Sequence, residues 1–183
     1  MNNRLALKSL ARVKIPAWAW LATLLVASPG LPFAAMAQRS IPEDLTIVMK
    51  RFNCEDGCPV YRIVIFGDGD VIWDGRNGVA HPGVSRTTIS PDAIRALIGD
   101  FESVHYFDLA DIYGYRGSGC GKAAPGKPVV LLLLALDGRS RTLWHHDGCA
   151  GEVSEKLTAL EESIDRAVGA ERWISGKNSR REK

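Results

Sequence analysis

The sequence predicts an α+β fold: a predominantly antiparallel sheet with two helices packed on one face, in the order β-β-β-β-α-β-β-α. Three observations predict it. In several short runs, apolar residues recur at every second position. Tight turns such as Gly67-Asp68-Gly69 separate neighbouring runs. Two further segments repeat apolar residues at helical spacing. A chain of about 150 residues beyond a leader segment is enough for one domain with a sizeable core.

The first half of the chain predicts four strands. Residues 45–50 alternate with a period of two, residues 61–65 and 71–73 do the same on either side of the Gly67-Asp68-Gly69 turn, and residues 85–89 form a fourth, Thr- and Ser-rich run. These runs predict a three-strand meander followed by one further strand.

Two segments predict helices. Ser90-Pro91-Asp92 is typical of a helix start, because Ser90 can cap free amides and Pro91 suits the first helical position. The apolar face of this first helix consists of Ile94, Leu97, Ile98 and Phe101. The second helix covers about residues 152–168, with an apolar stripe of Val153, Leu157, Leu160, Ile164 and Val168. We expect the charged residues off this stripe to be solvated: Glu155, Glu161, Glu162, Asp165 and Arg166.

The segment between the helices combines an irregular stretch with a hairpin. Residues 113–127 hold five glycines and Pro125, which predicts a long surface loop. Residues 128–136 are continuously apolar after Pro128, so we expect a strand covered on both faces or nearly so. Asp137-Gly138 then turns the chain, and residues 141–146 return antiparallel.

Several of these motifs resemble the bacterial DUF6438 family over roughly residues 46–174. They are Cys-x-x-x-Cys-Pro-Val-Tyr at 54–61, Gly-Asp-Gly at 67–69, a strand ending in Asp-Gly at 74–75, Ser-Pro-Asp at 90–92, and a closing helix followed by Trp173. The resemblance implies a small, usually exported α+β domain, and it implies no activity. Gly-Ser-Gly-Cys-Gly at 117–121 departs from the acidic, proline-containing loop expected in the family, so nothing is carried over to that segment.

Four cysteines in an exported chain imply two disulfides, and three pairings are open. We expect Cys54 to pair with Cys58 and Cys120 with Cys149. The first two lie close in sequence with a bend-forming Asp-Gly between them, and the resemblance presents the same knuckle as one unit.

The N-terminus is typical of a secretory signal peptide. Four basic residues without an acidic one precede an uncharged run over 15–37 that closes on Ala35-Met36-Ala37. We therefore expect cleavage after Ala37 and a periplasmic or secreted protein without a stable membrane span. The alternative is an N-terminal membrane anchor, since the run approaches the ~20 residues of a spanning helix, although Pro29 and Pro32 break it.

The expected domains are a signal peptide at 1–37, a lead-in at 38–44, one domain at 45–174 and a basic, disordered tail at 175–183. Removing the leader changes 23 basic and 21 acidic side chains to 19 and 21. We expect no nucleic-acid partner, because such a function needs a clustered positive surface and the basic cluster of the mature chain is its tail.

Three constellations could carry chemistry, and none is typical of an enzyme. Cys54 and Cys58 have one residue more between them than a thiol oxidoreductase motif, and the two carboxylates between them oppose a thiolate. Ser118 stands between glycines without the nucleophile-elbow pattern. The third, His145, His146 and Cys149, holds ligand types suited to zinc.

A metal site that uses both His145 and His146 has a geometric difficulty. The two are neighbours on a predicted strand, and neighbouring residues of a strand point to opposite faces. We expect no catalytic residue and no cofactor. The leading hypothesis is a non-catalytic binding module for an unknown protein or cell-envelope partner. Its candidate binding loop contains Tyr113, Tyr115, Arg116, Ser118 and Lys122. The alternative is a metal- or thiol-dependent activity that uses His145, His146 and the cysteines.

The mature chain is predicted to begin at Gln38. Intact mass and N-terminal sequencing of protein recovered after export check this expectation. A mass that retains residues 1–37 would contradict cleavage and favour the anchored form.

Overall fold

The structure, a computed structural model, describes residues 40–55, 57–114 and 119–176. In this part of the chain seven strands form one sheet in the order β4-β3-β2-β1-β6-β7-β5. The strands are β1 (Thr46–Arg51), β2 (Val60–Phe66), β3 (Asp70–Asn77), β4 (Gly83–Thr88), β5 (Ile112–Tyr113), β6 (Val129–Leu136) and β7 (Arg139–His146). All neighbours pair antiparallel except β5, which runs parallel to β7. The fold is therefore α+β with a mostly antiparallel sheet, as predicted.

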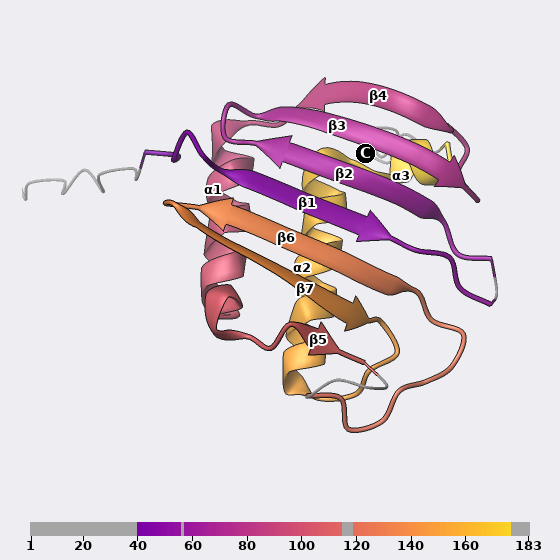
Figure 1. The fold of residues 1–183 in the computed structure, drawn as a ribbon. Helices are drawn as coiled ribbons and strands as arrows, with labels where there is room; N and C mark the ends of the chain where they lie inside the picture. The colour runs from indigo at the N-terminus through magenta and orange to yellow at the C-terminus, as the bar shows by residue number, and fades with distance from the viewer. Residues whose placement is uncertain (1–39, 56, 115–118, 177–183) are drawn as a thin grey trace, which may run out of the picture. The chain divides into compact units, whose positions relative to one another are not determined.

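The two long helices are α1 (Pro91–Ser103) and α2 (Glu152–Val168), which lie behind the sheet in Figure 1. Two shorter elements are η1 (Tyr106–Asp108) and α3 (Glu171–Ile174). The Ser90 hydroxyl accepts a hydrogen bond from the Ala93 amide at 3.2 Å, which is the predicted cap of α1. The predicted bounds of the second helix coincide with those of α2.

One face of the sheet packs against the helices and forms the core. Alternate residues of each central strand point to this face, and all of the following are buried: Leu45, Ile47, Met49, Ile63, Ile65, Val71, Trp73, Leu132, Leu134 and Leu143. From the helices they meet Leu97, Phe101, Leu157, Leu160 and Ile164. This core fixes the register, because a slip by one residue would turn each strand's apolar set to the other face.

The opposite face of the sheet carries no helix or strand of the described residues, and it faces the viewer in Figure 1. The expectation that residues 128–136 are covered on both faces or nearly so is therefore met on one face only. In β6 only alternate residues are fully buried, while Leu131 and Leu133 on the other face are half-buried. A continuous apolar run cannot by itself distinguish a strand with two covered faces from one whose second face stays open.

Three further features differ from the sequence-based expectations. The strand β5 lies at the start of the segment expected to be a loop, and β4 begins two residues before the expected fourth strand. The short helix α3 brings Trp173 onto Trp73, with ring centroids 5.0 Å apart.

The expected signal peptide and residues 177–183 of the expected tail lie outside the described residues. Within the described part, no helix is both long and apolar enough to cross a membrane.

Replacing Leu160 with alanine is expected to lower the free energy of unfolding by ~2–5 kcal/mol, because the side chain is 2% exposed in the core. That is a large share of the ~5–15 kcal/mol available to a domain. Lys156→Ala, at an exposed position of the same helix, is the control and should change stability by about 0.5 kcal/mol or less. Equal denaturation midpoints for the two variants would contradict this placement of α2.

Candidate functional site

Three connecting segments meet at one end of the sheet. They are the described residues of the β1–β2 connection (52–55 and 57–59), of the β5–β6 connection (114 and 119–128) and of the β7–α2 connection (147–151). Both disulfides lie in these segments, joining Cys54 to Cys58 and Cys120 to Cys149, with Cα atoms 5.3 Å apart in each pair. This is the expected pairing, and it leaves no free cysteine. We refer to this region as the disulfide end of the sheet.

The first disulfide closes a tight knuckle after β1. The Gly57 amide donates to the Cys54 carbonyl at 3.3 Å, and the Cys58 amide donates to the Cys54 sulfur at 3.0 Å. Gly57 has a φ of 79°, a backbone conformation that favours glycine. The knuckle therefore has its own hydrogen bonds in addition to the disulfide.

The second disulfide joins the long β5–β6 connection to the β7–α2 connection, three residues before α2 begins. Beside it, the Ala124 amide donates to the Gly148 carbonyl at 2.7 Å, and the Ala150 amide donates to the Lys122 carbonyl at 2.8 Å. Residues 121–124 are thus held along residues 148–150 by backbone hydrogen bonds as well as by a covalent bond. Because Cys149 is in the disulfide, its sulfur is not available as a metal ligand.

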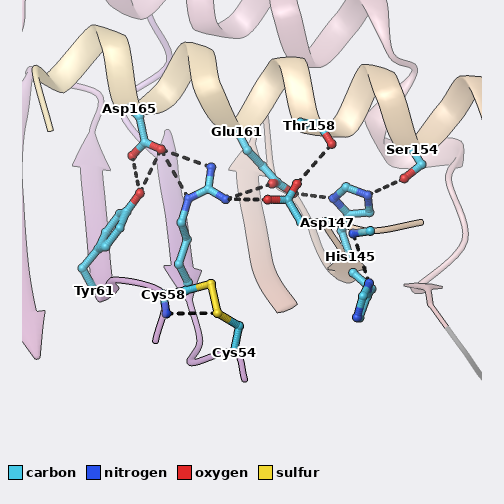
Figure 2. A network of polar contacts seen from close by, with 12 residues as sticks. Cys54, Cys58, Tyr61, His145, Asp147, Ser154, Thr158, Glu161 and Asp165 are labelled. Atoms are coloured by element: carbon cyan, nitrogen blue, oxygen red, sulfur yellow. Dashed lines mark hydrogen bonds and ion pairs between the residues drawn. A yellow bond between two sulfur atoms is a disulfide. The ribbon is translucent and has the colours of Figure 1, made fainter. Parts of the chain in front are cut away.

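A cluster of charged residues lies between the disulfide end of the sheet and α2 (Figure 2). At its centre the Arg51 guanidinium donates to Asp165 at 3.1 Å and to Glu161 at 3.5 Å, and it forms an ion pair with Asp147 at 3.5 Å. One cation thus faces three carboxylates. The Arg51 side chain is only 12% exposed and that of Glu161 is fully buried, so much of this charge is shielded from water.

The Tyr61 hydroxyl completes the environment of Asp165, donating to the carboxylate at 2.8 Å. Burial raises the pKa of Asp165 above its usual range, although Arg51 and Tyr61 act in the opposite direction. The pKa of Tyr61 is also raised, first by burial and then by the neighbouring carboxylate. The phenol therefore stays protonated and remains a hydrogen-bond donor.

His145 lies at the other end of the cluster, between Ser154 and Glu161. Its Nδ1 is 2.8 Å from the Glu161 carboxylate and its Nε2 is 2.6 Å from the Ser154 hydroxyl. A hydroxyl, an imidazole and a carboxylate in this order recur in hydrolases. All three residues are 0% exposed, however, so no substrate can reach the hydroxyl, and the chain of hydrogen bonds links β7 to α2.

The same region contains the ligand types of a metal site. One potential ligand atom from each of His145, Asp147 and Glu161 lies within 4.8 Å of the others. The Arg51 guanidinium already lies within 3.5 Å of both carboxylates and supplies the positive charge that a metal ion would bring. The set predicted from sequence does not form, because Cys149 is oxidised and His146 turns away, accepting from the Gly148 amide at 3.1 Å.

A cleft of about 430 Å³ opens beside the cluster, a volume typical of small-ligand sites. Arg51 of β1, Tyr61 of β2 and Asp147, the first residue after β7, line it. Its other lining residues come from the connecting segments and α3: Cys58, Pro59, Gly126, Lys127, Pro128 and Ile174. The cleft thus combines fixed polar groups with the tethered segments of the disulfide end.

The structure describes two of the five residues of the predicted binding loop. Tyr113 belongs to β5, is 6% exposed, and its hydroxyl accepts from the Ala110 amide at 3.1 Å, so it is a core residue. Lys122 is exposed. Tyr115, Arg116 and Ser118 lie outside the described residues.

The buried charges are what the sequence interpretation missed. Glu161 and Asp165 were expected on the solvated face of the second helix, and this expectation is wrong for both: Glu161 is 0% exposed, and 22% of the Asp165 side chain is exposed. A signal was present, because Glu161 lies four residues after Leu157 and three before Ile164 on the apolar stripe. Arg51 likewise has the same parity as the buried residues of β1.

The comparison with protein families gives one match. A family model described as "Domain of unknown function (DUF6438)" matches residues 45–168, which include the whole sheet and both long helices. No curated protein matches the chain.

The stability of the domain is expected to depend on pH through Glu161. Burial raises the pKa of this carboxyl in the folded state, so its contribution to stability is complete below its unfolded-state pKa and declines as pH rises through the folded-state value. The free energy of unfolding of the wild type should therefore fall, relative to that of Glu161→Gln, as the pH increases from about 4.5.

Urea denaturation of both proteins at a series of pH values measures this difference. Glu162→Gln, an exposed carboxyl on the same helix, is the matched control and should follow wild type. A difference between wild type and Glu161→Gln that is constant, or that grows in favour of wild type with pH, would show that burial does not dominate.

Proposed function

The chain belongs to the DUF6438 family, and from this premise we propose that it is a non-catalytic binding module that acts outside the cytoplasm. Its ligand is a protein or another component of the cell envelope. Its binding site is the cleft at the disulfide end of the sheet, with Lys127 at the exposed border and Tyr61 and Arg51 inside.

One observation carries this proposal: both disulfides secure the connecting segments that border one cleft. The first contributes Cys58 to the lining, and the second holds residues 121–124, which precede the lining residues Gly126 and Lys127. A surface held in one conformation loses less conformational entropy on binding than a mobile one. On a chain-entropy estimate, closing the longer loop is worth ~3.6 kcal/mol. That stabilisation falls on the segment that the proposal assigns to binding.

The proposal favours binding over catalysis because the reactive groups are engaged with one another. His145 and Ser154 are buried without access, Arg51 is paired with carboxylates, and every cysteine is in a disulfide. An active site needs a base or nucleophile within reach of a substrate. At this cleft the exposed groups are suited to hydrogen bonding and ion pairing instead.

The location outside the cytoplasm is supported by the two disulfides, which form and persist in oxidising compartments. The leader at residues 1–37 supports the same location, and we propose that it is removed after Ala37. The resulting protein would be periplasmic or secreted.

A metal-dependent activity is the second candidate, because His145, Asp147 and Glu161 bring three ligand types together. It requires Arg51 to move from the two carboxylates. Metal analysis of protein purified without added metal distinguishes the candidates. One equivalent of bound zinc that is lost in His145→Ala would favour the metal site over the binding module.

The binding proposal predicts that Lys127→Glu weakens capture of an envelope component by about tenfold, the usual size of a substantial interface contact. The measurement is quantitative affinity capture from an envelope extract, with components identified by mass spectrometry. Arg139→Glu is the matched control, since it makes the same charge change at the other end of β7. The double variant Cys120→Ser, Cys149→Ser should also weaken capture, because it releases the bordering segment.

Lys122→Glu separates the cleft from the wider loop. Lys122 lies on the same connection but does not line the cleft. Weaker capture with Lys122→Glu and unchanged capture with Lys127→Glu would place the binding surface outside the cleft. A component captured equally by all variants would contradict the proposal.

A further inference from the structure

A row of residues crosses the open face of the sheet, the face opposite α1 and α2 that is towards the viewer in Figure 1. Directly paired residues in consecutive strands define it. In strand order from β4 to β5 the row is Val84, Asp74, Arg62, Lys50, Leu131, Trp144 and Ile112. With strands about 4.8 Å apart, it is about 29 Å long.

This row contains all the large apolar side chains that are exposed in the described part of the chain. They are Val84 at 66%, Ile112 at 47% and Trp144 at 41%. Trp144 stacks on Phe52 with ring centroids 5.3 Å apart. The apolar groups thus stand at the two ends of one row instead of being scattered over the surface.

The part of this face that β1 to β4 form is basic. Its strand residues with outward parity include four cationic side chains, Arg62, Arg76, Arg86 and Lys50, and two carboxylates, Asp70 and Asp74. Asp74 is already neutralised by Arg76 at 2.7 Å and by Arg62 at 3.4 Å. The chain without residues 1–37 has more acidic than basic side chains, so the excess of basic side chains on these strands is opposite to the charge balance of the chain.

The charge distribution decides against a second copy of the chain packed face to face. In a symmetric dimer that places each strand over its own copy, the basic strands β1 to β4 would oppose one another, and like charges brought together disfavour association. A conventional protein partner also fits poorly. Protein interfaces have an apolar centre and a polar rim, whereas this row is charged in the middle and apolar at both ends.

We propose that the open face binds the surface of a bilayer that contains anionic phospholipid. Head-group phosphates would meet Arg62, Arg86 and Lys50, and Trp144 with its neighbour Ile112 would enter the interfacial region that tryptophan prefers. In a fluid bilayer, head groups can lie against the charged centre of the row while the apolar side chains at its ends enter the interfacial region. This surface is distinct from the cleft at the disulfide end, so the two proposals stand or fall separately.

The test uses the protein as it is recovered after export, with its mass measured first. It is mixed with vesicles of phosphatidylglycerol and phosphatidylcholine, or of phosphatidylcholine alone, and binding is measured by co-sedimentation and tryptophan emission. Trp73 and Trp173 are buried, so Trp144 reports on this face. We expect binding to the anionic vesicles, weakened by salt, with a blue shift of the emission that disappears in Trp144→Phe.

Arg62→Glu and Arg86→Glu should each weaken binding by at least about fivefold, the fold-change equivalent to ~1 kcal/mol per basic side chain near an anionic membrane. Lys156→Glu makes the same charge change on α2, behind the sheet, and should bind like wild type. A thermal melt of each variant confirms that it is folded before its binding is compared.

Three results would overturn the proposal. They are equal binding to vesicles with and without phosphatidylglycerol, an equal loss with Lys156→Glu and Arg86→Glu, and vesicle binding without an emission change at Trp144. Failure to bind vesicles together with saturable binding of one acidic protein, weakened by Arg86→Glu, would also overturn it and assign the face to that protein.

Discussion

The ion pairs of Arg51 are the interaction on which the disulfide end of the sheet depends. The guanidinium reaches across from β1 to α2, where its acidic partners lie more than one hundred residues further along the chain. Removing one member of such a cluster leaves buried charge without compensation, which costs far more than a surface pair contributes. Arg51 also lines the cleft. The contact that holds α2 against the sheet therefore fixes the polar floor of the proposed binding site as well.

Local pattern was sufficient to predict most of the elements. The helix start at Ser90 and the apolar stripe from Leu157 to Val168 depend on neighbours within one or two turns, so the sequence alone indicates them. The short strand β5 could not be predicted, since two residues carry no period and its pairing with β7 is made by the tertiary fold. Tyr113, the first residue of the predicted binding loop, therefore belongs to β5 and is part of the core.

The candidate site was harder to predict than the fold, for a physical reason. Glu161 and Asp165 are charged, and charged residues on a helix are usually solvated. Their burial depends on Arg51 and Tyr61, which approach only after the sheet has formed. Parity along β1 and position along the α2 stripe indicated inward-facing side chains, but neither pattern indicates which charges meet. The two predicted disulfides, in contrast, lie at the same end of the sheet as the charged cluster and the cleft.

The short strand β5 also bears on how the protein behaves when crowded. Unpaired strand edges can template the addition of further chains and lead to aggregation. Along β7, part of this edge is covered: β5 pairs with Trp144 and His145, and the Arg141 side chain binds the carbonyls of Phe107 and Leu109. The other edge, β4, is short and carries the charged Arg86. The cover on β7 and the charge on β4 both act against growth of the sheet by addition of the protein's own copies.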